Sequence, residues 1–229
     1  MIDTQWNMKP DKAKALMLAK RQLAQLVYDA VNLEGIHFTL PEIQTLLDGV
    51  TVGGHKLADQ HIALNQAQAW RTLFSHIEKN MFEITAESAC SLHAIAARDE
   101  ALEWGQFRSG SVTIAGTTYM PPGADQLSKL FDAMIEQASD FSDIYDQAIH
   151  FFLTMARVQF FYDVNKRMGR FIMNGLLLNN GYPAINLPST RQLEFNEKML
   201  LFYESGNPSS MNRFLRSCLD NRIISIMLE

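Results

Sequence analysis

The stretch Gln159-Phe-Phe-Tyr-Asp-Val-Asn-Lys-Arg-Met-Gly-Arg170 joins two apolar helical segments and holds the densest group of polar side chains in the chain. It follows the apolar run from Phe151 to Val158, and the next helix begins near Asn165. A loop that enters a helix presents unpaired backbone N–H groups and the positive end of the helix dipole. The stretch therefore predicts two helices joined by a polar turn, with an anion site at the turn.

Three cations stand at the start of the second helix: Lys166, Arg167 and Arg170. Arg167 and Arg170 are three residues apart and share a helix face. Unpaired cations at a helix N-terminus each cost a few tenths to about 1 kcal/mol, a cost that a bound phosphate would remove. Asp163 offers a carboxylate for Mg²⁺, which commonly takes one or two carboxylates plus phosphate oxygens. The alternative is that solvent or other acidic groups neutralise these charges.

Helical periodicity extends outward from this stretch in both directions. Residues with three-and-four spacing, typical of buried helix faces, include Leu23, Leu26, Val27, Ala30, Val31, Trp70, Leu73, Phe74, Ile77, Met211, Phe214, Leu215, Cys218 and Leu219. Further helical stretches are 85–99, 124–138, 144–158, 166–180 and 190–204. Thr39 and Glu42 have the spacing of a capping box and open a short helix that ends near Gly49. The pattern predicts a single all-α domain over 1–229, with 1–50 as an N-terminal helical layer.

One segment departs from helical spacing. In Gly110-Ser-Val-Thr-Ile-Ala-Gly-Thr-Thr-Tyr119, Val112 and Ile114 alternate with polar residues around Gly116, and two prolines follow. This alternation predicts a short β-hairpin. A lone hairpin buries little surface by itself, so it is either a packed decoration or a working flap.

The amino-acid composition excludes several classes of protein. Hydrophobic residues make up 47% and charged residues 20% of the chain, which argues against disorder. The formal net charge of −5 gives no electrostatic reason to expect nucleic-acid binding. Cys90 and Cys218 lack metal or disulfide spacing. The first residues have no secretory pattern, and no apolar run reaches the roughly 18 residues of a membrane span. We expect a cytoplasmic protein without a membrane partner.

The polar turn resembles the Fic motif, His-Pro-Phe-x-Asp/Glu-Gly-Asn-Gly/Lys-Arg-x-x-Arg. The positions that match are Phe161, Asp163, Asn165, Arg167 and Arg170. Gly105-Gln-Phe-Arg-Ser, Val112-Thr-Ile-Ala-Gly and Tyr119-Met-Pro-Pro resemble the Fic flap, and Asn174-Gly-Leu-Leu-Leu with Gly181-Tyr-Pro resembles the segment after the motif. The resemblance covers about residues 90–200. It implies an all-α, Fic-type helical bundle with one short β-hairpin flap.

Fic proteins typically transfer AMP from ATP to a hydroxyl group of a target protein, so the resemblance implies ATP as substrate, Mg²⁺ and a protein partner. It assigns Mg²⁺ to Asp163 and the terminal phosphate to Arg170. The other phosphate contacts would come from Asn165, Lys166 and Arg167. It places the target segment along the flap at Val112, Thr113 and Ile114.

Three positions depart from the motif. Gln159 stands where Fic proteins have the histidine that serves as general base, and a carboxamide does not take a proton near neutral pH. General-base help is worth about 10²–10⁴ in rate, so the resemblance implies a slow enzyme. Phe160 and Val164 replace a proline and a glycine; a β-branched Val164 disfavours positive φ and restricts the loop. Lys166 resembles the lysine that the Doc branch of the superfamily has at this position, and in that branch phosphate is transferred instead of AMP. Recruiting His93 or His150 as the base would require the fold to bring either one close.

A second resemblance lies near the N-terminus. Many Fic proteins carry an inhibitory helix with the pattern Ser/Thr-x-x-x-Glu-Gly/Asn, and Glu34-Gly35 matches its end while Ala30 replaces the hydroxyl residue. The resemblance implies that Glu34 pairs with Arg170 and blocks the terminal phosphate. The alternative is that Gly35 only terminates a helix.

Three functions stay open on the sequence. The first is AMP transfer to a protein hydroxyl, and the second is a Doc-like kinase or toxin component, motivated by Lys166. The third is a catalytically degenerate module that binds nucleotide or a peptide strand, motivated by Gln159. Fic proteins often associate through helical surfaces, which implies a homo-oligomer, but the sequence identifies no interface.

Overall fold

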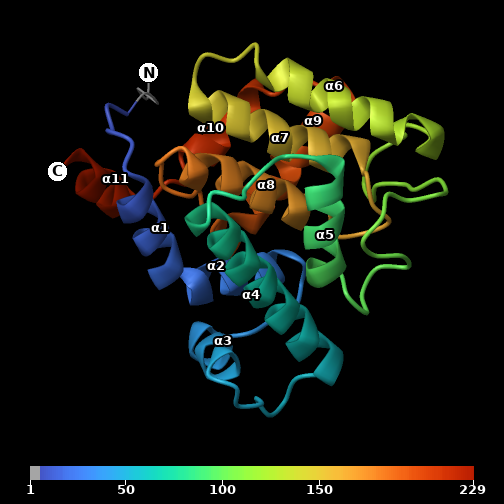
Figure 1. Ribbon diagram of the computed structural model, residues 1–229. Coiled ribbons are helices and arrows are strands. Elements are labelled where there is room, and N and C mark those ends of the chain that lie inside the picture. The colour runs from blue at the N-terminus through green and yellow to red at the C-terminus, as the bar shows by residue number, and fades with distance from the viewer. Residues whose placement is uncertain (1–5) are drawn as a thin grey trace.

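The computed structural model describes residues 6–229, so residues 1–5 of the predicted N-terminal layer lie outside the described part. Within it the chain forms eleven α-helices and two short 3₁₀ helices (Figure 1). The α-helices are α1 Lys12–Arg21, α2 Leu23–Leu33, α3 Leu40–Leu47, α4 Leu57–Glu78, α5 Ala86–Ala96, α6 Leu127–Ala138, α7 Ile144–Val158, α8 Asn165–Asn179, α9 Gln192–Ser205, α10 Ser209–Arg216 and α11 Asn221–Leu228. The 3₁₀ helices are Ala124–Gln126 and Ser189–Arg191.

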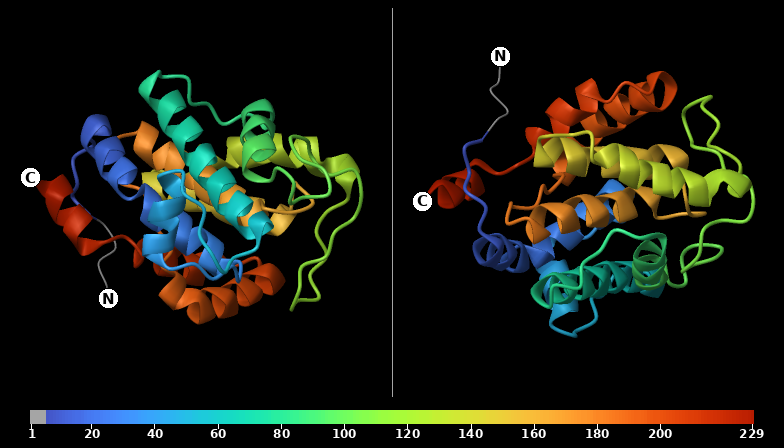
Figure 2. Two further views of the ribbon diagram at one scale, coloured as in Figure 1. Left: turned by 90° about the horizontal axis from the view of Figure 1, so that it is seen from below. Right: turned by 45° about the horizontal axis from the view of Figure 1, so that its top comes forward.

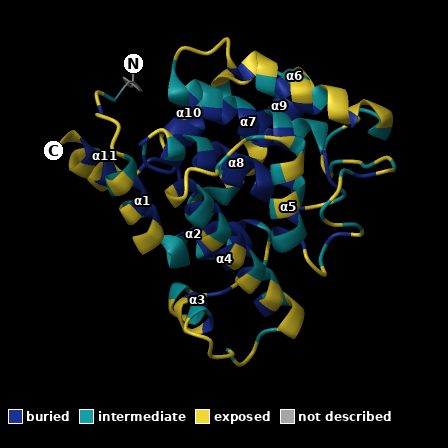
Figure 3. Ribbon diagram, in the orientation of Figure 1, coloured by how far each residue is buried: buried dark blue, intermediate teal, exposed yellow. Residues whose placement is uncertain are grey.

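Helix α8 lies at the centre of the molecule and is buried on nearly all sides (Figures 1 and 3). It contacts α7, α4, α5 and α1, which explains why apolar residues occur around its whole circumference. A side chain at Gly169 would place its Cβ 3.0 Å from the backbone oxygen of Phe152. The missing side chain thus lets α8 approach α7 closely, and this fixes the polar turn between them.

The N-terminal helices form a layer beside α4. Helix α2 packs against both α3 and α4, and Figure 2 shows this group on one side of the central helix. The predicted capping box is confirmed: Thr39 accepts a hydrogen bond from the backbone N–H of Glu42, whose carboxylate accepts one from Thr39. The buried carboxylate of Asp29 accepts hydrogen bonds from Asn186 and Ser189, which fastens α2 to the segment that follows α8.

The predicted helices at 85–99, 124–138, 144–158, 166–180 and 190–204 are confirmed, as α5 to α9. The β-hairpin at 110–119 is not: no strand is assigned anywhere in residues 6–229. The segment is a loop that runs along the outside of the helices (Figures 1 and 2). Val112 and Ile114 are half-buried and Thr113 is exposed, so the alternation of burial exists without a hydrogen-bonded ladder. Ile114 and Tyr119 pack against the hydrophobic core, and no strand-to-strand hydrogen bond joins the two halves of the loop.

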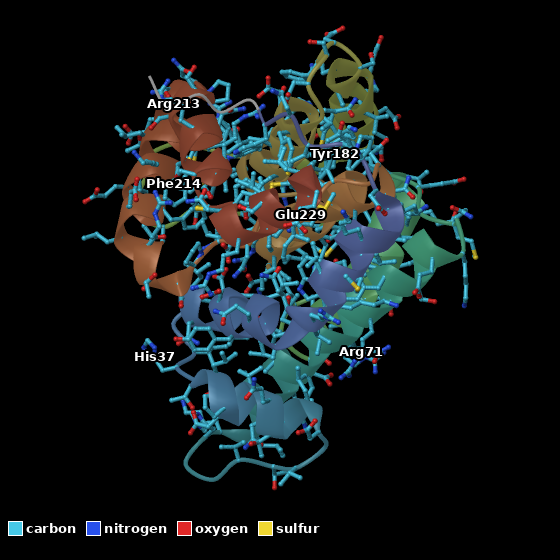
Figure 4. All side chains as sticks on the ribbon, turned by 90° about the vertical axis from the view of Figure 1, so that its left-hand side faces the viewer. His37, Arg71, Tyr182, Arg213, Phe214 and Glu229 are labelled. Atoms are coloured by element: carbon cyan, nitrogen blue, oxygen red, sulfur yellow. The ribbon has the colours of Figure 1, made fainter. Side chains whose placement is uncertain are left out.

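Both cysteines are unpaired, as expected, with Cys218 buried and Cys90 partly buried. Across the described residues, no helix is both long enough and apolar enough to cross a membrane. Arginines far from the polar turn, such as Arg71 and Arg213, are exposed and extend away from the ribbon (Figure 4). Arg167 and Arg170, in contrast, are buried at the start of α8.

Candidate functional site

The turn between α7 and α8 covers residues 159–164 and is bounded by two residues with left-handed backbones. Gln159 ends α7 with a φ of 55°, and Val164 precedes α8 with a φ of 64°. The sequence expectation that Val164 avoids positive φ is therefore wrong: the left-handed conformation, costly for a β-branched residue, is imposed here by the fold. Between them, Phe160 and Phe161 are fully buried and hold the turn to the core.

Asn165 stabilises the turn from inside. Its side-chain oxygen accepts a hydrogen bond from the backbone N–H of Phe161 at 2.9 Å, and its amide nitrogen donates to the carbonyl of Phe161 at 2.8 Å. The same nitrogen donates to the side-chain oxygen of Gln159 at 3.0 Å. Gln159 in turn donates to the carbonyl of Ala156 at 2.6 Å. The Asn165 side chain is thus engaged within the loop, and its contact with phosphate stays a prediction.

Arg108 connects the base of the 110–123 loop to this turn. Although it is 2% exposed, its guanidinium faces backbone carbonyls and no carboxylate: it donates to Gln159 at 2.6 Å, Gly110 at 2.6 Å and Pro122 at 2.5 Å. Its own backbone N–H donates to Phe160. Sequence reasoning included Arg108 in the flap resemblance but assigned it no role, because an arginine buried among carbonyls leaves no periodic signal.

Two carboxylates from other elements neutralise the cations of α8. Glu34, at the C-cap of α2, lies 3.2 Å from Nζ of Lys166 and 3.7 Å from Nη2 of Arg170. Glu100 forms a two-pronged ion pair with both terminal nitrogens of the buried Arg167. The acidic-partner alternative raised for these charges therefore describes this structure. Sequence reasoning missed Glu100, which lies 67 residues before Arg167 in no recognisable pattern.

The contacts of Glu34 agree with the predicted Glu34–Arg170 pair and add Lys166 as the nearer partner. Burial by itself raises the pKa of the Glu34 carboxyl, but Lys166, Arg167 and Arg170 together hold that pKa below its usual value. Burial lowers the pKa of Arg170 to about 10, against the opposing pull of Glu34. Gly35 also has a φ of 80° and ends α2, so the residue pair both terminates a helix and delivers a carboxylate to α8.

Asp163 is the carboxylate that the resemblance assigns to Mg²⁺. It is exposed, and one carboxylate oxygen accepts the backbone N–H of Val164 at 2.6 Å. The described residues contain no cluster of three or more His, Cys, Asp or Glu side chains that could hold a metal. A single exposed carboxylate fits an ion that shares its coordination with phosphate oxygens, which is the usual manner of Mg²⁺.

The two histidines considered as a base, His93 and His150, are both engaged in other contacts. His93 is fully buried and stacks on Phe161 with ring centroids 3.8 Å apart. Its Nδ1 accepts the N–H of Gly105, and its Nε2 donates to the carbonyl of Asp163, so both ring nitrogens are engaged. Burial lowers the pKa of His93 to about 4. His150 donates to the carbonyl of Met134, on α6.

Comparison with known proteins agrees with this geometry. The sequence model of the Fic/DOC family matches residues 83–177. A protein adenylyltransferase Fic from Drosophila ananassae is 26% identical over 222 residues, which cover 93% of this chain and 44% of that protein. The chain therefore spans less than half the length of this curated relative.

Solved structures share the fold over most of the chain. A Fic-domain-containing signaling protein from Bacteroides thetaiotaomicron has a TM-score of 0.78 at 16% identity, covering 97% of this chain and 91% of that one. Fic-1 from C. elegans also has a TM-score of 0.78 at 16% identity, covering 92% of this chain and 64% of that one. The chain has an all-α Fic-like fold, and its residues 83–177 match the sequence model of the Fic/DOC family.

Proposed function

We propose that the chain binds the phosphates of ATP at the start of α8 and transfers AMP to a hydroxyl group of a target protein. The observation that carries this proposal is the position of Glu34, which brings one carboxylate from α2 to both Lys166 and Arg170. A carboxylate held by two cations at a helix N-terminus occupies the place of an anion, and phosphate oxygens can replace it. Release of Glu34 therefore opens the phosphate site, and Glu34 acts as a resting-state inhibitor.

The residues of the turn divide into two groups. Lys166 and Arg170 supply the charges that become free when Glu34 leaves, so they hold the phosphates, with Arg170 on the terminal one. Asn165 and Arg167 act mainly by shaping the site, because their side chains are already engaged with the turn and with Glu100. Asp163 would hold Mg²⁺, which supplies charge neutralisation for the polyphosphate when bound. Val112, Thr113 and Ile114 would contact the target segment from the outer loop.

In the proposed reaction, the hydroxyl oxygen of the target forms a bond to the α-phosphorus of ATP. The bond from that phosphorus to the bridging oxygen breaks, and pyrophosphate leaves with the electron pair. The hydroxyl proton passes to solvent water, because the Gln159 carboxamide cannot accept it. Positioning and charge stabilisation remain, so the reaction is slow rather than absent.

The test uses the Glu34→Gly chain with Mg²⁺ and a cell lysate, supplied in parallel with α-labelled and γ-labelled ATP. AMP transfer predicts protein labelled from the α-phosphate only. The matched control is Glu34→Gly/Arg170→Ala, which should lose the label. If neither ATP label reaches protein and calorimetry shows no ATP binding, the proposed function is wrong.

Two other functions are supported by single observations and give other outcomes of the same test. Lys166 favours a Doc-like kinase, which predicts label from the γ-phosphate. The engagement of the Gln159 side chain with Ala156 and Asn165 favours a degenerate binding module, which predicts ATP binding without any label.

A further inference from the structure

A small group of buried polar atoms lies without hydrogen-bond partners behind the polar turn. Of the described residues, four buried side chains have such an atom: Gln66 Oε1, Tyr145 OH, Arg167 Nε and Arg170 Nη2. Three of these four side chains, all except Tyr145, line a single cavity between α2, α4 and α8. Buried polar groups are nearly always hydrogen-bonded, so three side chains that each have an unpartnered atom and line one cavity point to a shared partner.

The cavity is too small for anything but a single solvent molecule. Its volume is about 10 Å³, close to the roughly 10–15 Å³ that one water molecule requires. The rest of its lining consists of apolar residues and of two asparagines whose side chains have hydrogen-bond partners of their own: Leu26, Ala30, Trp70, Phe171, Ile185, Asn174 and Asn186.

The polarity of the three atoms selects the kind of occupant. Arg167 Nε and Arg170 Nη2 are donors only, and Gln66 Oε1 is an acceptor. The orientation of the Gln66 amide is fixed, because its nitrogen donates to the carbonyl of Ala96 at 3.0 Å. Two guanidinium groups exclude a cation, and an amide oxygen disfavours an anion. Water accepts two hydrogen bonds and donates to a third group, which matches this set.

We propose that one ordered internal water joins Gln66 on α4 to Arg167 and Arg170 on α8. The water completes the hydrogen bonding of Arg170 Nη2, which lies 3.7 Å from Glu34 and outside hydrogen-bond distance of it. Arg170 then keeps a partner when Glu34 withdraws. This consequence rests on the proposed function, whereas the hydration site itself does not. Gln66 is thus a positioning residue that acts on Arg170 through the water.

The first experiment is a crystal structure of the unaltered chain at about 1.5 Å resolution. The proposal expects a water peak within hydrogen-bond distance of Gln66 Oε1, Arg167 Nε and Arg170 Nη2. A dry cavity, or side chains that pair these atoms with one another, would overturn it. A parallel structure of Ala30→Ser should show the serine hydroxyl in place of the water peak. A water peak retained at the same position would contradict the proposed location of the water beside position 30.

A second measurement concerns the positioning role. In the Glu34→Gly chain, Gln66→Met keeps the side-chain length but removes the acceptor, and calorimetry should show ATP binding several-fold weaker. An unchanged affinity would overturn the positioning role. If the water peak is present but Glu34→Gly binds no ATP, the proposed function fails while the hydration site stands.

Discussion

Val164 holds a backbone conformation that is costly for its side chain. A non-glycine residue in the left-handed region costs about 1–2 kcal/mol, and yet Val164 has a φ of 64°. The side chain is 3% exposed, and burial of valine contributes about 1.5–3 kcal/mol relative to leaving it exposed. Burial therefore offsets the strain, which is why the position tolerates valine.

This balance predicts an unusual order of stability at position 164. Val164→Ala loses buried methyl groups and keeps most of the strain, whereas Val164→Gly loses more apolar surface but removes the strain. We expect both to destabilise the fold by about 1–2 kcal/mol, with glycine no worse than alanine. Chemical denaturation measures this, and Val27, fully buried within α2, is the matched control. There, glycine should be about 1 kcal/mol worse than alanine; the same order at 164 would contradict strain in the turn.

Gln159 is oriented by Ala156 and Asn165 but cannot take a proton. In the Glu34→Gly background, Gln159→His should raise the rate of AMP transfer by about 10²–10⁴, because it supplies a general base. The rate should then rise with pH through the histidine pKa. Gln159→Asn is the control and should give no gain. If histidine brings no increase while ATP binding is intact, the missing base is not what limits the site.

At the scale of elements, the polar turn is held from outside by two contacts that no local sequence pattern encodes. Arg108 fastens it to the base of the outer loop, and His93 on α5 stacks against Phe161 and bonds the Asp163 carbonyl. His93 therefore works as a neutral structural group between α5 and the turn, and its protonation should loosen that junction.

The pH dependence of stability follows from the lowered pKa of His93. Burial is the main cause, and its value of about 4 in the folded chain lies below the ordinary 6.5. The unfolded chain binds the proton first, so the contribution of His93 is complete above pH 6.5 and is lost as the pH falls toward 4. The loss is on the order of 3 kcal/mol. Urea denaturation between pH 7 and pH 4 should show a smaller decline in the free energy of unfolding for His93→Phe. Burial also lowers the pKa of His150, so part of the decline should remain in the variant. A decline as steep as in the unaltered chain would mean that protonation of His93 does not weaken the contact between α5 and the turn.

At the scale of the whole molecule, two distant segments supply the carboxylates that neutralise the central helix. Glu34 comes from the N-terminal layer, and Glu100 from the segment that leads into the outer loop. Each of the three cations at the start of α8 thus has a carboxylate partner within the chain. Of these two carboxylates, only Glu34 is shared by two cations. Under the proposed function, the same carboxylate stabilises the fold without ligand and opposes phosphate binding.

This double role predicts opposite effects of removing Glu34. Glu34→Gln should lower the free energy of unfolding of the free chain by about 1–3 kcal/mol, since Lys166 and Arg170 lose their partner. With ATP and Mg²⁺ at about 100 times the dissociation constant, the variant should regain about 2.7 kcal/mol. Thermal unfolding with and without ATP measures both effects. The unaltered chain should gain less at the same ATP concentration, and an equal gain would show that Glu34 does not compete with phosphate.

The order of helices, the capping box and the cationic polar turn could be predicted from sequence, because each depends on side chains a few residues apart. Helical spacing located α5 to α9, and the motif residues located the turn. The hairpin prediction failed because alternating apolar and polar residues indicate only that one side of an extended segment is buried. A loop that lies against helices produces the same alternation. The left-handed backbone of Val164 contradicted local propensity, since burial of its side chain outweighed the strain.

The sequence by itself determined an all-α chain with three cations at the start of its central helix and no histidine before the turn. The resemblance also implied the pair of Glu34 with Arg170, and only the tertiary structure decided that Glu34 lies nearer to Lys166 and that Glu100 takes Arg167. The physical reason is range. Helix propensity and capping act over about one turn of the chain, whereas the ion pair of Glu100 with Arg167 joins residues that only packing brings within 4 Å, and no spacing in the sequence encodes that approach.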